Sequence, residues 1–182
     1  MKFKNIIFFI LSAALVVFIF WNGSRSGEVS VSSSDNVTNT IRDIMISTGK
    51  IPDNLVKYEE TSESSDKSES NVSVNMYRLN ILVRKSAHRI EYGLLAALSF
   101  MAFFCFEISK STSAIMSYVL SIVVAFIDEA IQAFTPGRSS SFKDVFIDSQ
   151  GVLAGIILAV IIVWIAHFSK NKEKFQKNLK IN

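Results

Sequence analysis

Residues 151–168 read GVLAGIILAVIIVWIAHF, an apolar run of 18 residues without a charged side chain. At about 1.5 Å of helical rise per residue this run covers roughly 27 Å, close to the hydrocarbon thickness of a bilayer. The composition agrees: apolar residues make up 49% of the 182-residue chain, charged residues make up 19%, and the mean hydropathy is +0.34. The single cysteine, Cys105, excludes a disulfide framework within the chain. The run therefore predicts a membrane-spanning helix.

Three further apolar runs lie upstream. Residues 5–21 are uncharged and follow Lys2 and Lys4, so they fit either a secretory signal peptide or a retained first span. We favour the retained span, because no A-x-A-like cleavage site follows. Residues 92–106 and 113–127 are uncharged over only 15 positions each, about 22 Å, so each needs a neighbouring polar stretch to cross the bilayer. The fold predicted is an all-α polytopic membrane protein with four transmembrane helices in a bundle.

Basic residues near the chain ends predict the orientation. Lys2 and Lys4 precede the first run, and five lysines follow the last one, at positions 170, 172, 174, 177 and 180. By the positive-inside rule both termini face the cytoplasm, which an even number of spans satisfies. The polar start of the second span and the polar end of the third then face outward together. We expect a multi-pass protein of the cell membrane.

The chain is expected to have four parts. Residues 1–21 are the first transmembrane helix with a short cytoplasmic N-terminus, 22–83 an extracytoplasmic segment, 84–168 a three-helix core, and 169–182 a basic cytoplasmic tail. In the extracytoplasmic segment, the Ser/Glu-rich stretch 59–73 is predicted to be disordered. A short amphipathic surface helix is predicted before it, capped by Ser34 or Asp35, from the helical spacing of Val37, Ile41, Ile44 and Met45.

Polar residues gather at the start of the second span. Arg84, His88, Glu91 and Tyr92 share one helix face, and Lys85 borders it. One interpretation is that Arg84 and Lys85 extend into the headgroup layer and Tyr92 belongs to an aromatic belt. That interpretation is weaker for Glu91, which is followed by apolar sequence. A binding or catalytic face is the alternative.

The third span ends in carboxylates. Asp128 and Glu129 are followed one turn later by Gln132, and a line of small residues leads to them: Ser117, Ser121 and Ala125. Small helix faces pack against neighbouring helices, so we expect these acids inside the bundle. A buried carboxylate there needs a partner. Besides Arg89, the suitable partners at that level are Arg84, Lys85, His88, Gln132 and Arg138.

A similar stripe runs along the fourth span, through Asp144, Asp148, Gly151 or Val152, Gly155 and Ala159. Asp144 also fits a capping box with Ser141. Arg138 follows a Pro-Gly turn and either binds an anion beside helix N-terminal amides or pairs with Asp144. A divalent metal held by these acids and His88 is a further alternative, but no local metal motif supports it. We expect no metal and no other cofactor.

The polar motifs resemble those of the VanZ-like family of membrane proteins. Residues 84–95 fit R-K-S-A-H-x-x-E-Y-x-x-L, residues 128–138 fit D-E-x-x-Q-x-F-x-P-G-R, and residues 144–155 fit D-x-x-x-D-x-x-G-x-x-x-G. The likeness covers most of residues 5–165, with Arg89 and the Ser/Glu-rich insertion as departures. It implies a bacterial cell-envelope protein, in a family whose founding member is linked to teicoplanin resistance. The resemblance brings no established catalytic activity.

Two functions from different classes remain open. The first is a non-enzymatic protein that binds an anionic lipid-linked or wall-polymer headgroup at the outer leaflet, with Arg84, Lys85 and Arg138 holding the anion. The alternative is a membrane enzyme acting on an envelope lipid or glycan, with His88 or Glu91 as general base and Asp128 or Glu129 as acid or metal ligand. Membrane lipids are the expected partners, and nucleic acid is not. The candidate ligand-binding residues are Arg84, Lys85, His88, Glu91, Tyr92, Asp128, Glu129, Gln132, Arg138, Asp144 and Asp148.

Overall fold

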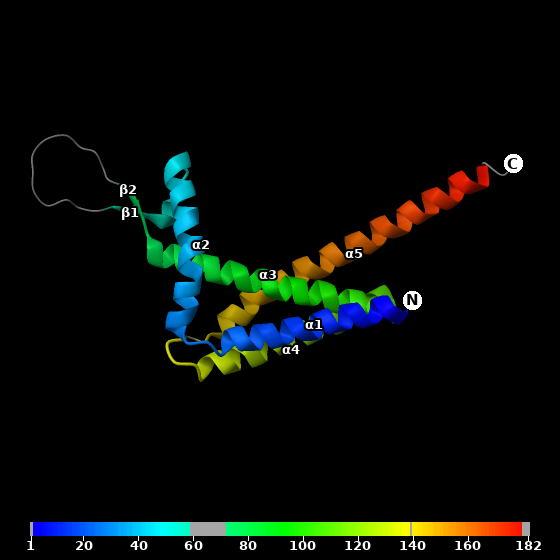
Figure 1. Ribbon diagram of the computed structural model, residues 1–182, viewed down its shortest axis with the longest axis horizontal. Helices are drawn as coiled ribbons and strands as arrows, with labels where there is room; N and C mark the ends of the chain where they lie inside the picture. Colours follow the sequence, from blue (N-terminus) through cyan, green and yellow to red (C-terminus); the bar gives the residue numbers. More distant parts are fainter. Residues whose placement is uncertain (1, 59–71, 139, 180–182) are drawn as a thin grey trace, which may run out of the picture.

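Five long helices make up most of the computed structural model, which describes residues 2–58, 72–138 and 140–179 (Figure 1). In chain order the elements are α1 (Lys2–Gly23), α2 (Gly27–Thr48), the short 3-10 helix η1 (Asp53–Leu55), β1 (Val56–Tyr58), β2 (Val72–Val74), α3 (Met76–Cys105), α4 (Lys110–Ala133) and α5 (Phe142–Leu179). Three of the long helices, α1, α3 and α4, lie side by side (Figure 1). Helix α3 packs against α1, α2, α4 and α5, and so forms the centre of the molecule. Helix α1 begins and α5 ends at the same end of the bundle, and α2 crosses the opposite end (Figure 1).

Three helices are long and apolar enough to cross a membrane within the described part of the chain. They cover Ile6–Gly23, Lys110–Ala133 and Phe142–Ser169. Helix α3 is not one of them, because its charged residues between Arg84 and Glu91 leave too short an uncharged stretch before its end at Cys105. The all-helical membrane protein is thus confirmed with three candidate spans, and the fourth span stays a prediction.

The tightest helix crossing joins α3 to α5. A Cβ atom added to Gly155 would collide with the carbonyl oxygen of Gly93, and one added to Gly151 would collide with that of Arg89. The predicted stripe on α5 is confirmed here: Asp148, Gly151, Val152, Gly155 and Ala159 are buried, and Asp144 is half-buried. The outward side chains of α5 are large and apolar, including Ile157 and Ile161, as lipid-facing positions require. Glycine at these two positions lets the backbones touch, which fixes where the two helices cross.

Helix α2 is longer than predicted and begins earlier. Its N-cap is Ser26, whose Oγ accepts a hydrogen bond from the Val29 amide, so the predicted capping by Ser34 or Asp35 is wrong. Those two residues lie inside the helix and bond instead to Asn80 of α3, at 3.2 Å for Ser34 and 3.0 Å for Asp35. Sequence periodicity predicts the helix but not its start, because residues 27–33 are too polar to reveal it.

The predicted apolar face of α2 is half right. Ile41 and Met45 pack against a small cluster formed by Leu55, Val74 and Leu79, whereas Val37 and Ile44 are 51% and 56% exposed. The cluster closes over a two-stranded antiparallel sheet in which Val56 of β1 pairs with Val74 of β2. Val72 and Ser73, at the end of the stretch predicted to be disordered, belong to β2, and residues 59–71 lie outside the described residues. This cluster holds α2 across the start of α3.

Candidate ligand-binding site

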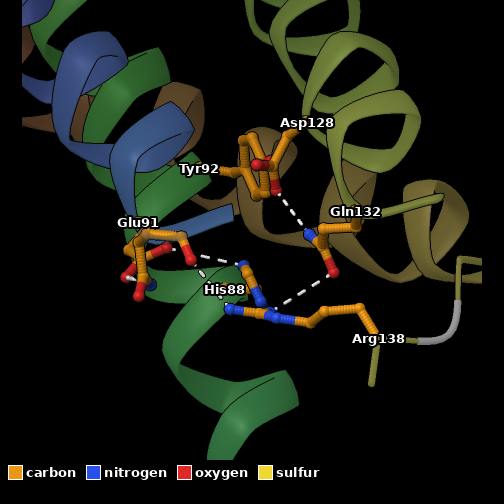
Figure 2. A network of polar contacts seen from close by, with 7 residues as sticks. His88, Glu91, Tyr92, Asp128, Gln132 and Arg138 are labelled. Carbon is orange, nitrogen blue, oxygen red and sulfur yellow. Dashed lines mark hydrogen bonds and ion pairs between the residues drawn. The ribbon is translucent and has the colours of Figure 1, made fainter. Parts of the chain in front are cut away.

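A hydrogen-bonded network joins α3, α4 and the loop that follows α4 (Figure 2). The Tyr92 hydroxyl donates to Asp128 Oδ2 at 2.9 Å, and Gln132 Nε2 donates to the same oxygen at 2.7 Å. The His88 ring stacks on the Tyr92 ring with centroids 6.3 Å apart. Arg138 Nη1 reaches Gln132 Oε1 at 3.4 Å. The side chains that the sequence placed on separate spans therefore lie together, with a tyrosine and an amide, rather than a cation, bonded to Asp128.

His88 and Glu91 form a second pair on the α1 side of α3. His88 Nδ1 lies 3.5 Å from Glu91 Oε2, and Asn22 Nδ2 of α1 donates to Glu91 Oε1 at 3.5 Å. Neither atom of the His88–Glu91 pair makes a hydrogen bond of good geometry to any described residue, and both are buried. The other oxygen of Asp128, Oδ1, is also buried without a bond and faces Gly23, where a Cβ atom would collide with it. The end of α1 thus closes one side of the polar cluster.

Arg138 fastens the loop after α4 to the junction of α1 and α2. Its Nη2 donates to the carbonyl oxygen of Asn22 at 2.7 Å and its Nε to that of Arg25 at 3.2 Å. Next to it, the Gly27 amide donates to the Pro136 carbonyl at 3.0 Å. Burial, together with the nearby Arg84 guanidinium, lowers the pKa of Arg138. Arg138 is thus committed to backbone carbonyls and does not pair with Asp144.

Asp144 pairs with Lys85 instead, with Nζ and Oδ1 2.6 Å apart. The pair links the first turn of α5 to α3. The start of α5 is fixed further by two bonds at Ser141, whose amide donates to Glu129 Oε2 at 2.9 Å and whose carbonyl accepts from the Asp144 amide at 2.8 Å. The capping box is therefore only partly realised, because a carboxylate of α4 takes part in capping α5.

A polar cavity of about 580 Å³ opens between α2, α3, α4 and α5. Seven of the predicted residues line it: Arg84, Lys85, His88, Glu129, Gln132, Asp144 and Asp148. The other four, Glu91, Tyr92, Asp128 and Arg138, do not, and they support its walls instead. Sequence reasoning missed Asp35, Thr38 and Asn80, which also line the cavity, because nothing in a single sequence shows that α2 crosses α3.

A second cavity of about 650 Å³ lies along another face of α3. Its wall is mostly apolar in area, and the apolar residues that line it include Val37, Ile41, Met45, Leu79, Leu82, Val83 and Ile90. Arg84 and His88 line both cavities, and Glu91 lines only the second. The two cavities therefore border each other at Arg84 and His88, beneath α2.

Two charged side chains in this region lack a direct partner. Arg84 makes no hydrogen bond or ion pair with any residue in ranges 2–58, 72–138 and 140–179. Asp148 is only 5% exposed and likewise accepts no hydrogen bond from the described residues. Within the same ranges no three His, Cys, Asp or Glu side chains come together as metal ligands would. The Arg84 guanidinium and the Asp148 carboxylate therefore both face the polar cavity and are free to bind a ligand.

The fold and the site define a helical membrane protein with a polar cavity at one end of its bundle. The family model of VanZ/LLP1 matches residues 8–164, and the chain belongs to this family. The match includes all the residues that line the two cavities. No curated protein and no solved structure matches the chain significantly.

Proposed function

We propose that this VanZ/LLP1 protein binds an anionic headgroup, of a lipid-linked molecule or a wall polymer, at the outer leaflet of the bacterial cell membrane, and that it contributes in this way to teicoplanin resistance. The observation that carries the proposal is Arg84. This guanidinium lines a polar cavity, has no partner among the described residues, and offers five N–H donors suited to a phosphate or carboxylate. Lys85, beside it, adds a second cation when its bond to Asp144 opens.

The proposed topology has four spans and two cytoplasmic termini. Helix α3 lies alongside the three candidate spans, and its uncharged half packs among them through buried residues such as Leu95, Ala96 and Phe100. The charged half of α3 lies at the end that α2 crosses (Figure 1). That arrangement supports α3 as the fourth span, with its charges at the outer surface, where Glu91 bonds to α1 and Lys85 to α5.

Identification of retained lipids tests the proposal. Full-length protein purified in mild detergent is analysed by native mass spectrometry, and the bound lipids are identified after dissociation. We expect anionic lipids to be retained, and Arg84→Gln to lower their retention about tenfold, since a charge-assisted hydrogen bond contributes that much. Arg42→Gln is the matched control, because Arg42 is half-buried, pairs with the neighbouring Asp43 and lines neither cavity. Equal retention by the two variants, or no anionic lipid on the unmodified protein, contradicts the proposal.

The link to teicoplanin has its own measurement. Cells that express the chain are expected to tolerate a higher teicoplanin concentration than cells with an empty vector, and the Arg84→Gln variant is expected to lose that tolerance at equal membrane abundance. If the Arg84→Gln variant keeps its tolerance, protection against teicoplanin does not depend on the anion site, and this part of the proposal is wrong.

A membrane enzyme is the second candidate, and one observation favours it. His88 lines both cavities while its Nδ1 faces the Glu91 carboxylate at 3.5 Å, an arrangement that orients an imidazole as a general base. Glu91→Gln distinguishes the two functions, because a binding protein keeps its lipid retention in that variant. If the protein is an enzyme, the Glu91→Gln variant no longer converts its substrate, and unconverted lipid accumulates on the purified protein.

A further inference from the structure

The apolar cavity has no role in binding a headgroup, yet it borders the polar cavity. Its volume of about 650 Å³ falls within the roughly 300–1,000 Å³ of small-molecule sites. Side chains from α2 and α3 give it a hydrocarbon-like wall, and three of them, Val37, Leu82 and Ile90, are 51%, 42% and 70% exposed. Such a wall suits an aliphatic chain better than a polar ligand.

Arg84 stands at the boundary between the two cavities. It lines both of them together with His88. Arg138 lies close to Arg84. Burial and repulsion from the Arg84 guanidinium both lower the pKa of Arg138, so positive charge is concentrated at this point. A phosphate bound at Arg84 would therefore have a polar cavity on one side and an apolar cavity on the other.

The polar cavity also holds many hydrogen-bond acceptors, in addition to the donor groups of Arg84. Four carboxylates line it, from Asp35, Glu129, Asp144 and Asp148, against the two cations Arg84 and Lys85. Asp148 is only 5% exposed and accepts no hydrogen bond from the described residues. Buried carboxylates need donors, and a fully ionised phosphate ester has none to give, whereas each hydroxyl of a sugar donates one.

We infer that the ligand is a lipid phosphate that carries a sugar. The sugar occupies the polar cavity and donates to Asp148, the phosphate binds Arg84, and the hydrocarbon chain lies in the apolar cavity beside Val37 and Ile90. The inference rests on the proposed function, because the phosphate is the anion that Arg84 binds there. It adds two features that an anion site does not need, namely a donor-bearing headgroup and a chain held by the protein.

Four probes separate these features in binding titrations with the full chain in phosphatidylcholine nanodiscs. The complete probe is a phosphodiester that joins glucose to a dodecyl chain. The other three each lack one part: dodecyl phosphate lacks the sugar, dodecyl glucoside the phosphate, and glucose 1-phosphate the chain. We expect the complete probe to bind about tenfold or more tightly than each of the others, since each part adds at least one charge-assisted bond or a buried chain.

Two variants assign the parts to their cavities. Asp148→Asn is expected to weaken the complete probe about tenfold and to leave dodecyl phosphate unaffected, which also shows that the variant is folded. Val37→Ser is expected to weaken the probes that have a chain and to leave glucose 1-phosphate unchanged. Val29→Ser is the matched control, because Val29 is an exposed valine of α2 that lines neither cavity.

The outcomes distinguish this inference from the proposed function. If dodecyl phosphate binds as tightly as the complete probe and Arg84→Gln weakens both, the proposed contact between a sugar and Asp148 is wrong, but the proposed anion site at Arg84 is supported. If glucose 1-phosphate binds as tightly as the complete probe, the proposed binding of a hydrocarbon chain in the apolar cavity is wrong. If no phosphate-bearing probe binds, or if Arg84→Gln changes none of them, the proposed function itself fails.

Discussion

The two halves of the bundle are held together differently. At the end that α2 crosses, hydrogen bonds between side chains link the helices: Asp128 of α4 accepts from Tyr92 of α3, and Glu91 of α3 accepts from Asn22 of α1. In the other half, the buried polar side chains among the described residues are serines of α1, α3 and α4, whose hydrogen bonds stay within a helix or its cap, and Ser99 and Ser121 have unbonded hydroxyl oxygens. There the helices meet through small and apolar side chains such as Phe100 and Ala159. One half is specified by hydrogen bonds and the other by shape, so the two should respond differently to the same kind of substitution.

The largest difference expected between the halves is their exposure to the outside of the cell. In a Cys105→Ser background, a cysteine at Thr48 in α2 should react with a membrane-impermeant maleimide on intact cells. A cysteine at Ser169, near the other end of α5, should react only after permeabilisation. Both positions are exposed on the protein surface, so burial does not confound the readout. Labelling of position 169 from outside would overturn the proposed orientation.

The boundary between the halves should be the most sensitive point for assembly. Gly155→Leu places a side chain where the Gly93 carbonyl lies, and a clash with backbone should cost more than the roughly 3 kcal/mol of ordinary overpacking. We expect loss of the folded protein in thermal unfolding monitored in detergent. Ala154→Leu is the control, because Ala154 is exposed on the same helix. Similar melting of both variants would mean that the helices do not cross at Gly93.

Within the polar half, Asp128→Ala should destabilise the protein by about 2 kcal/mol. The substitution leaves the Tyr92 hydroxyl and the Gln132 amide buried without their shared acceptor, and each unsatisfied donor has a desolvation cost. Asp128→Asn keeps one acceptor oxygen and should lose less. Equilibrium unfolding in a denaturing detergent measures both variants. Equal stability of Asp128→Ala and the unmodified protein would show that the network does not hold the helices together.

Within the apolar half, Ser121→Ala should change stability by no more than about 0.5 kcal/mol. The Ser121 hydroxyl oxygen is fully buried and has no bond to lose among the described residues, so its removal also removes an unsatisfied group. The same unfolding measurement applies. A loss above about 1 kcal/mol would indicate a hydrogen bond at Ser121, and the contrast between the two halves would disappear.

The candidate site shows how far helix periodicity reaches. Spacing correctly put Ser117, Ser121 and Asp128 on one buried face of α4, because burial of a helix face follows from its side-chain pattern. It also selected seven of the residues that line the polar cavity. It expected Arg138 in the anion site, whereas Arg138 bonds to the carbonyls of Asn22 and Arg25. A pattern shows which side of a helix is buried, but not what lies opposite.

The contribution of α2 was the main feature beyond reach of the sequence. Asp35 and Thr38 face the polar cavity and Val37 and Ile41 the apolar one, although the spacing indicated only a surface helix. The direction in which α2 leaves α1 is fixed by Arg138 and by the contact of Gly27 with Pro136, more than 100 positions later in the chain. Contacts over that separation leave no local pattern in a single sequence.

The sequence by itself determined the apolar helices and the concentration of charge at one end of the bundle. Both follow from the thickness of the hydrocarbon layer and from the cost of placing charge inside it, which act on each helix separately. Only the tertiary structure decided that Tyr92 bonds to Asp128, that Lys85 pairs with Asp144, and that Arg84 stays unpaired between two cavities. These pairings depend on the axial offset between helices. That offset is set where Gly93 and Gly155 let two backbones touch, and by the loops that join the helices.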